Sequence, residues 1–230
     1  MTNTMAPTFT QDWFSRHADG WKTHLGHLAA SDVDYLELGS FEGRSARFIC
    51  ELLPKAKVTC VDFWPPGMAG PEANFDLNMG PFAHRVRKIK GRSGAVLDQL
   101  WSEQARFDVI YVDANHERWY AFADAVLAWP LLREGGIMIF DDYMIDMDKP
   151  RDQRCKDAID VFHRTFAECM TVLSCRWQVI VSKNSDWPES TRPRLSKTGR
   201  PFKQRVRGEL GNVRRTIRSA GQKYFPMMRS

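Results

Sequence analysis

Four acidic side chains stand directly after apolar runs that have the length of buried strands. Asp62 follows "KVTCV", Asp113 follows "FDVIYV", and the pair Asp141 and Asp142 follows "IMIF". If the strands before Asp113 and Asp141 are neighbours, three carboxylates crowd one region, and their repulsion favours a bound divalent cation. Asp113, Asp141 and Asp142 are the predicted metal ligands. Mg²⁺ suits them better than Zn²⁺, because no set of Cys and His residues shares the region.

His116 lies three residues beyond Asp113, at the start of a predicted helix. Its pKa range makes it a candidate general base for a hydroxyl whose proton a metal ion has loosened. The alternative for these residues is structural. His116 would then be a cap or a surface residue, Asp113 would cap the helix that follows it, and Asp142 would cap the next segment.

Residues 35–46, "YLELGSFEGRSA", end an apolar run at Glu37 and add two glycines, Gly39 and Gly43. This spacing lacks the middle glycine of the dinucleotide fingerprint, and no Lys-Ser/Thr pair follows, so a dinucleotide or ATP site is disfavoured. Glycines bring bare backbone close to a ligand, and Glu37 is placed to meet a cationic group. The alternative is that both glycines only allow close packing of strand and helix.

Asp62 follows the glycine turn by about 20 residues, the spacing at which an acid accepts hydrogen bonds from ribose hydroxyls. Phe63 and Trp64 come next and could cover an adenine ring. The alternative for Asp62 is a helix cap.

The elements that must position these residues alternate between strands and helices. Alternation of this kind predicts a doubly wound α/β domain, with its ligand site at the carboxyl ends of the strands. Residues 65–84 are too long and too rich in Gly and Pro for a simple connection, so we expect a loop there that contacts the substrate. The predicted strands are 34–40, 57–64, 85–93, 107–114, 137–143 and a pair within 171–183; the helices are 12–30, 43–54, 94–104, 116–136 and 152–170.

The composition agrees with one full domain plus an appendage, since the chain has 230 residues and is 43% apolar. Five cysteines, an odd number that lies mostly in apolar segments, indicate reduced thiols and a cytoplasmic protein. The first residues lack the pattern of a signal peptide, and no apolar run is long enough to span a membrane.

The positive charge is concentrated at the end of the chain. Residues 183–230 hold 13 Lys+Arg and 3 Asp+Glu, which gives this tail a charge of about +10 and the rest about −5. We expect one α/β domain over 1–182, a linker over 183–200 and a basic amphipathic helix over 201–230. The helix could lie on an anionic membrane at the inner face, cover a groove of the body or of a second subunit in a homodimer, or remain a solvated arm.

The chain resembles class I S-adenosylmethionine-dependent methyltransferases in four segments: "YLELGSFEGRSA", "VTCVDFW", "FDVIYVDANH" and "LLREGGIMIFDDY". More narrowly, they resemble the metal-dependent O-methyltransferases of the catechol and macrocin type, over residues 30–182. The resemblance implies a mostly parallel seven-stranded sheet with an antiparallel last strand, followed here by a basic C-terminal extension. It implies methionine contacts at Glu37, Gly39, Ser40, Phe41 and Gly43, a ribose contact at Asp62 beside Phe63 and Trp64, adenine contacts at Arg92 and Ser93, and a cofactor, metal and catalytic role for Asp113.

Two positions depart from that family. The catechol enzymes place a lysine where this chain has His116, and several sugar enzymes place an acid where it has Asn115.

The expected activity is Mg²⁺-assisted methyl transfer to a hydroxyl of a small molecule or sugar, preferably a vicinal diol. The alternative is a non-catalytic S-adenosylmethionine-binding or scaffold protein that its tail tethers to a membrane or partner; a dehydrogenase ranks third. A nucleic-acid substrate is disfavoured because base-methylating motifs are missing.

Overall fold

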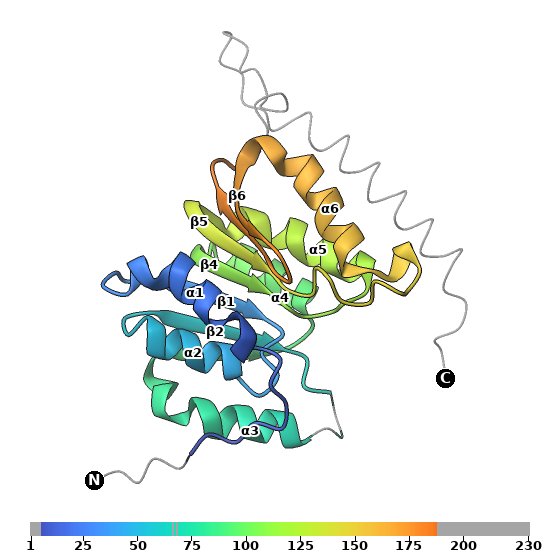
Figure 1. The fold of residues 1–230 in the computed structure, drawn as a ribbon. Helices are drawn as coiled ribbons and strands as arrows, with labels where there is room; N and C mark the ends of the chain where they lie inside the picture. Colours follow the sequence, from blue (N-terminus) through green and yellow to red (C-terminus); the bar gives the residue numbers. More distant parts are fainter. Residues whose placement is uncertain (1–5, 66, 68, 188–230) are drawn as a thin grey trace. The chain divides into compact units, whose positions relative to one another are not determined.

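One mixed sheet of seven strands, in the order β3-β2-β1-β4-β5-β7-β6, organises the chain (Figure 1). The computed structural model describes residues 6–65, 67 and 69–187, so the predictions for 188–230 lie outside the described residues. Strands β1 to β5 are parallel, and β7 is antiparallel to both β5 and β6, as expected. The strands are β1 Asp34–Leu38, β2 Lys57–Asp62, β3 Val86–Lys90, β4 Phe107–Val112, β5 Leu132–Phe140, β6 Met170–Cys175 and β7 Val179–Lys183.

Helices cover both faces of the sheet. Successive residues of a strand point to opposite faces, so Tyr35 packs in the core beneath α1 and α2, whereas Leu36 and Leu38 pack beneath α4, α5 and α6. The α-helices are α1 Ala18–Leu25, α2 Arg44–Leu52, α3 Ala69–Met79, α4 Ser93–Ser102, α5 Arg118–Ala128 and α6 Cys155–Phe166. Among the described residues, no helix is long and apolar enough to cross a membrane.

The segment 65–84, which the sequence predicted to be a loop, contains the helix α3 and a 3₁₀ turn over Gly80–Arg85. Its apolar periodicity is weak, and helices of this kind are stabilised by packing rather than by intrinsic propensity. Phe75 and Met79 are buried and lie against Gly43 at the start of α2. The prediction of a loop was therefore wrong, and the reason is a tertiary contact.

Two other predicted helices have different limits in the structure. Within 12–30 there are three short helical segments, Ser15–His17, Ala18–Leu25 and Gly26–Leu28, and Trp13 precedes them with 58% of its surface exposed. Helix α5 ends at Ala128, two residues before Pro130, so the glycine pair at 135 and 136 lies inside β5 rather than at the end of the helix. Trp101, near the end of α4, is 51% exposed.

The cysteines agree with the expectation of reduced thiols. All five are free, four are buried, and Cys175 at the end of β6 is exposed.

The ends of β1 and β4 approach so closely that Gly39 has no room for a side chain. A Cβ on Gly39 would lie 1.9 Å from the backbone oxygen of Asp113, and the φ of Gly39 is +91°. Such a φ already disfavours other residues, and the contact with backbone cannot be relieved by a rotamer change. The junction of the two strands therefore requires glycine.

We predict that Gly39→Ala lowers the free energy of unfolding by roughly 2 kcal/mol or more, because the new methyl group must displace backbone. Urea denaturation followed by circular dichroism measures the change. Gly20→Ala in α1 is the matched control, since a Cβ there meets nothing within 4 Å. That variant should be neutral or stabilising by up to about 1 kcal/mol. Equal effects of the two substitutions would contradict the steric argument.

Candidate active site

The register of three parallel strands brings the predicted acids together. Leu38 pairs with Val112, and Val112 pairs with Phe140, so the next residues of the three strands lie at one level. The backbone N–H of Asp113 donates to the carbonyl of Leu38 at 2.9 Å, and that of Asp141 donates to the carbonyl of Val112 at 3.0 Å. The sheet order reverses between β1 and β4, which is where open α/β sheets bind ligands.

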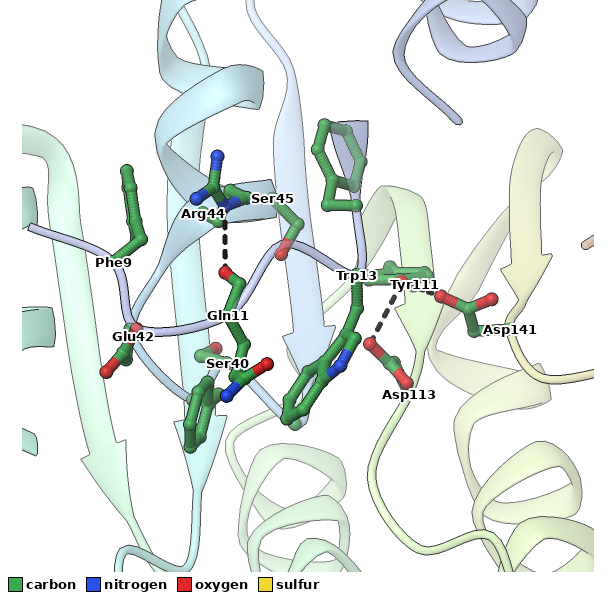
Figure 2. A pocket seen from close by; sticks show the side chains of 13 residues that line it. Phe9, Gln11, Trp13, Ser40, Glu42, Arg44, Ser45, Tyr111, Asp113 and Asp141 are labelled. Carbon is green, nitrogen blue, oxygen red and sulfur yellow. Dashed lines mark hydrogen bonds between the residues drawn. The ribbon is translucent and has the colours of Figure 1, made fainter. Parts of the chain in front are cut away.

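Three cavities meet at Gly39, which lines each of them. The largest, about 420 Å³, runs toward the start of α4 and α5 and is called the α4–α5 cavity. The second, about 380 Å³, contains the acids and is called the acidic cavity. The third, about 40 Å³, lies over the start of α2 and is called the α2 cavity (Figure 2).

The α4–α5 cavity contains several of the residues predicted to hold a nucleoside. Asp62 lies in its wall, and its carboxylate accepts the backbone N–H groups of Phe41 and Trp64, both at 2.8 Å. Phe63 is 42% exposed, and the guanidinium of Arg92 lies 4.6 Å from its ring centre. Further lining residues are Val61, Gly91, Ser93, Gly94, Ala95, Ala114, Asn115, Tyr120, Ala123 and Asp124.

Trp64 points away from this cavity. Only 1% of its surface is exposed, its ring packs 4.9 Å from that of Phe75, and its Nε1 donates to the carbonyl of Phe41 at 2.8 Å. Trp64 therefore fixes the turn after β1 from the core side, whereas the sequence had suggested that it covers a ligand.

The α2 cavity is lined by Ser40, Phe41 and Ser45 from the glycine turn and the first turn of α2. Glu37 lies behind them, completely buried; its Oε2 accepts the hydroxyl of Tyr35 at 2.7 Å, and its Oε1 has no hydrogen-bond partner among the described residues. Desolvation raises the pKa of Glu37 to about 7. The hydroxyl of Ser40 is likewise buried and unpartnered. Ser45 was not singled out from the sequence, although its place in the first turn after the glycines was a usable signal.

Gly43 lines none of the three cavities. It precedes α2 with a φ of +77°, and a Cβ on it would lie 3.0 Å from the Phe75 ring and 3.1 Å from Met79. For this glycine the structure favours the packing alternative, because the space next to it is filled by α3.

An N-terminal strap, which we define as residues 8–13, forms the outer wall of the α2 cavity; Phe9, Gln11 and Trp13 line it (Figure 2). The buried Glu42 accepts the backbone N–H and the hydroxyl of Thr10 at 2.6 and 2.8 Å. Asn78 of α3 pairs with the backbone of Thr8 at 2.7 and 2.8 Å. The strap was not predicted from the sequence, because no pattern within residues 8–13 shows that they bond to Glu42 and to Asn78 of α3.

The acidic cavity brings together Asp113, His116 and Asp142, each of which offers a ligand atom within 4.8 Å of the others. His116 Nε2 lies 2.8 Å from Asp142 Oδ2 and 3.9 Å from Asp113 Oδ1. Two of the three predicted metal ligands are thus adjacent, and the imidazole that the sequence assigned as a base completes the group. The sequence placed His116 near the proposed ion as a base, and the structure brings its Nε2 close to both carboxylates.

Asp141, the third predicted ligand, is not in that group. Its carboxylate accepts the hydroxyl of Tyr111, the side-chain amide of Gln178 at 3.1 Å and the backbone N–H of Asp142 at 2.8 Å. Figure 2 shows the Tyr111 hydroxyl between Asp113 and Asp141, where it contacts both carboxylates. Asp141 therefore orients its neighbours in this structure.

Burial and mutual repulsion shift the titration of these groups. Desolvation, with the charges of Asp141 and Asp142, raises the pKa of Asp113 well above its usual range. The hydrogen bond to Asp142 raises the pKa of His116. Close carboxylates that resist ionisation favour a cationic partner.

The remaining wall of the acidic cavity comes from the N-terminal segment and from the loops after β1, β4 and β5: Trp13, Arg16, His17, Phe41, Ala114 and Ile145. Burial lowers the pKa of His17, whose Nε2 lies 4.0 Å from Asp141. The described part of 65–84, which we expected to contact substrate, lines none of the three cavities.

Residues 36–143 match the family described as "Methyltransferase domain". A curated relative from Acanthamoeba polyphaga mimivirus, "Uncharacterized protein R132", is 28% identical over 117 residues, which are 49% of this chain and 52% of that protein. "O-methyltransferase hkm8" from Aspergillus hancockii is 32% identical over 117 residues, 50% of this chain and 44% of that protein. The chain thus spans about half the length of the curated relatives it matches.

Solved methyltransferase structures share the fold. An O-methyltransferase from Bacillus cereus in complex with SAH (S-adenosylhomocysteine) has a TM-score of 0.61 at 18% identity, over 76% of this chain and 84% of that one. MycE, from the mycinamycin biosynthetic pathway, solved with Mg, SAH and mycinamycin VI, has a TM-score of 0.59 at 16% identity, over 85% of this chain and 53% of that one. Residues 36–143, just under half of the chain, thus match a methyltransferase domain, and the seven-stranded sheet has the fold of the solved methyltransferases.

Proposed function

We propose that the chain is an S-adenosylmethionine-dependent, divalent-cation-assisted O-methyltransferase that acts on a hydroxyl of a small molecule or sugar. The observation that carries the proposal is the junction at Gly39. Three cavities open onto this glycine: one is suited to a nucleoside, one is suited to an amino acid, and one contains carboxylate and imidazole groups. A methyl group held at that junction would face the acids.

The residues present fit the cofactor. Two buried polar atoms, Glu37 Oε1 and Ser40 Oγ, have no hydrogen-bond partner within the part of the chain that the structure describes; Ser40 lines the α2 cavity, and Glu37 lies in β1 two residues before Gly39. They suit the ammonium end of a methionine, because buried polar atoms without partners are costly until a ligand satisfies them. Asp62, Arg92 and Ser93 suit the ribose and the adenine.

The acidic cavity fits a divalent cation by the chemistry of its donors. Asp113 and Asp142 would hold the ion with His116 as the third donor, and Mg²⁺ or Mn²⁺ accepts such a set. MycE was solved with Mg, which supports the same assignment by analogy of fold. The sequence assigned His116 the role of general base, and the two roles differ in a measurable way.

When bound, the cofactor supplies an electrophilic methyl group, and the cation supplies charge that lowers the pKa of an acceptor hydroxyl. The protein supplies position and a dry environment. Asp62 orients the ribose, the strap excludes water from the methionine end, and Trp13 and Phe41 form apolar wall beside the acids. His116, if it is not a ligand, takes the hydroxyl proton.

The experiment that tests the proposal uses the full chain. We expect SAH to raise the melting temperature, and we expect a methylated product by mass spectrometry when S-adenosylmethionine, Mg²⁺ and catechol or a vicinal diol sugar are supplied. EDTA should lower the rate. Absence of SAH binding together with absence of Mg²⁺ binding by calorimetry would overturn the proposal. The alternative of a tethered scaffold rests on residues outside the described part of the chain.

We predict that Asp142→Asn lowers the affinity for Mg²⁺ or Mn²⁺ at least about 10-fold, whereas Asp141→Asn changes it little. Asparagine suits position 142, because the φ of Asp142 is +57° and asparagine tolerates that region. Calorimetric titration of the protein without acceptor measures both. His116→Ala separates the two roles of the histidine. If His116 is a ligand, the variant binds the cation more weakly; if His116 is the base, the variant keeps its cation affinity and loses only turnover. Equal losses in Asp141→Asn and Asp142→Asn would contradict the assignment.

We predict that Glu37→Gln stabilises the protein at pH 8 relative to wild type, and does so less at pH 5. The folded pKa of Glu37 is raised from 4.5 to about 7, so the native state holds its proton where the unfolded state has released it. Wild-type stability therefore falls as pH rises from 4.5 toward 7, by up to roughly 3 kcal/mol for this group. Urea denaturation at both pH values measures it, and the difference should shrink with saturating SAH, whose ammonium favours the ionised acid. A difference that does not vary with pH would refute the argument.

A further inference from the structure

Arg16 lies at the acidic cavity without a charged partner in the described part of the chain. It belongs to the 3₁₀ turn Ser15–His17, lines the cavity and is exposed to solvent. Its Nε donates to the carbonyl of Trp13 at 3.3 Å, and its guanidinium carbon lies 5.6 Å from the centre of the Trp177 ring. These contacts hold the guanidinium, which is always charged, but neither of them neutralises it.

The acids of this cavity already have partners. Asp142 lies 2.8 Å from His116, and Asp141 accepts two side-chain hydrogen bonds and one from the backbone. In the proposed function, a divalent cation at Asp113, His116 and Asp142 would balance the negative charge that remains there. Among the described residues that line the cavity, Arg16 then carries a charge that nothing in the protein matches.

The position of Arg16 assigns it to the acceptor rather than to the cofactor. It lines the acidic cavity and neither of the other two, whereas Arg44 lines the α2 cavity, where a methionine would lie. The acidic cavity, about 380 Å³, has the size of a small-molecule site. Trp13, Phe41 and Ile145 give it apolar wall for the body of such a molecule. An acceptor whose hydroxyl lies at the acids therefore shares one small cavity with Arg16.

A purely structural role does not account for this guanidinium. Its contact with Trp177 joins the N-terminal segment to the turn between β6 and β7, but an exposed cation–π contact stabilises a protein only slightly. The contact also leaves the terminal N–H groups of the guanidinium free to bind an anion.

We propose that Arg16 selects acceptors that carry a carboxylate, so that the methyl acceptor is a small hydroxy acid. This inference rests on the proposed function and names the acceptor class of that site. The hydroxyl of the acceptor lies at the cation, and its carboxylate binds the guanidinium. A planar guanidinium and a carboxylate form two parallel hydrogen bonds between opposite charges, and a neutral carboxamide cannot reproduce this arrangement.

The test compares each acid with its own carboxamide, which has the same size but no charge. The full chain, with saturating SAH and Mg²⁺, is titrated calorimetrically with protocatechuate, dihydrocaffeate and D-glucuronate, and with the three amides. At least one acid should bind about 10-fold or more tightly than its amide, because a hydrogen bond to a charged group contributes at least that factor. Raising KCl from about 0.05 to about 0.5 M should shrink this preference, since salt screens an exposed ion pair. These measurements need no variant, so they hold even if a substitution impairs folding.

Arg16→Gln supplies the second arm, because it removes the charge and the planar fork. The preference for the acid should fall to within about 3-fold, while the affinity for the amide stays the same. Arg106→Gln is the matched control. Arg106 is likewise exposed, with its guanidinium 5.4 Å from the centre of the Trp101 ring and 2.8 Å from the carbonyl of Ala105, but it lines none of the three cavities. This variant should keep the wild-type preference.

The outcomes separate the two proposals. Protein that binds SAH and Mg²⁺ but prefers none of the three acids over its amide, or binds none of the six compounds, overturns the role of Arg16 and leaves the proposed function standing. A preference that does not vary with salt, or that Arg16→Gln leaves unchanged, has the same meaning. Protein that binds neither SAH nor Mg²⁺ overturns the proposed function, and this inference with it.

Discussion

The alignment of three parallel strand ends is the constraint on which the site depends. Because β1, β4 and β5 pair in parallel register, Gly39, Asp113 and Asp141 follow their strands at one level of the sheet. Neighbouring strands are about 4.8 Å apart, so side chains at that level must touch or bind something between them. Gly39 contributes only backbone, and this leaves space at the point where the three cavities open.

A second consequence of this arrangement is electrostatic. Glu37 lies behind the α2 cavity, Asp113 lies at the junction, and Asp124 lies in the wall of the α4–α5 cavity; burial raises the pKa of each. Ionised, these acids oppose folding, and they are relieved by ligands that bring positive charge or hydrogen-bond donors. On the proposed function, a ligand with positive charge and hydrogen-bond donors would relieve these acids, and they lower the stability of the protein without it.

The outer wall of the site is held from a distance. The N-terminal strap crosses the start of α2, and Glu42 and Asn78 hold it by hydrogen bonds to Thr10 and Thr8. Asn78 comes from α3, whose own position depends on the contact of Phe75 and Met79 with Gly43. The segment 65–84 thus supports the strap through Asn78. Trp13 of the strap lines both the α2 cavity and the acidic cavity.

The sequence by itself determined the doubly wound sheet and the acids at the strand ends, because apolar runs and the breaks after them are local properties of the chain; the antiparallel last strand was implied by the family resemblance. The family resemblance implied that Arg92 and Ser93 lie near Asp62 and Phe63, and all four residues line one cavity, because each follows or ends a strand. Only the tertiary structure decided that α3 is a helix, that Trp64 faces the core, and that the His116 imidazole lies within 4.8 Å of the Asp113 and Asp142 carboxylates. The burial of Asp124 and the position of the strap were likewise not recognisable in advance. Each of these depends on which side chain from a distant element fills a space or takes a hydrogen bond, and no pattern within one segment encodes that.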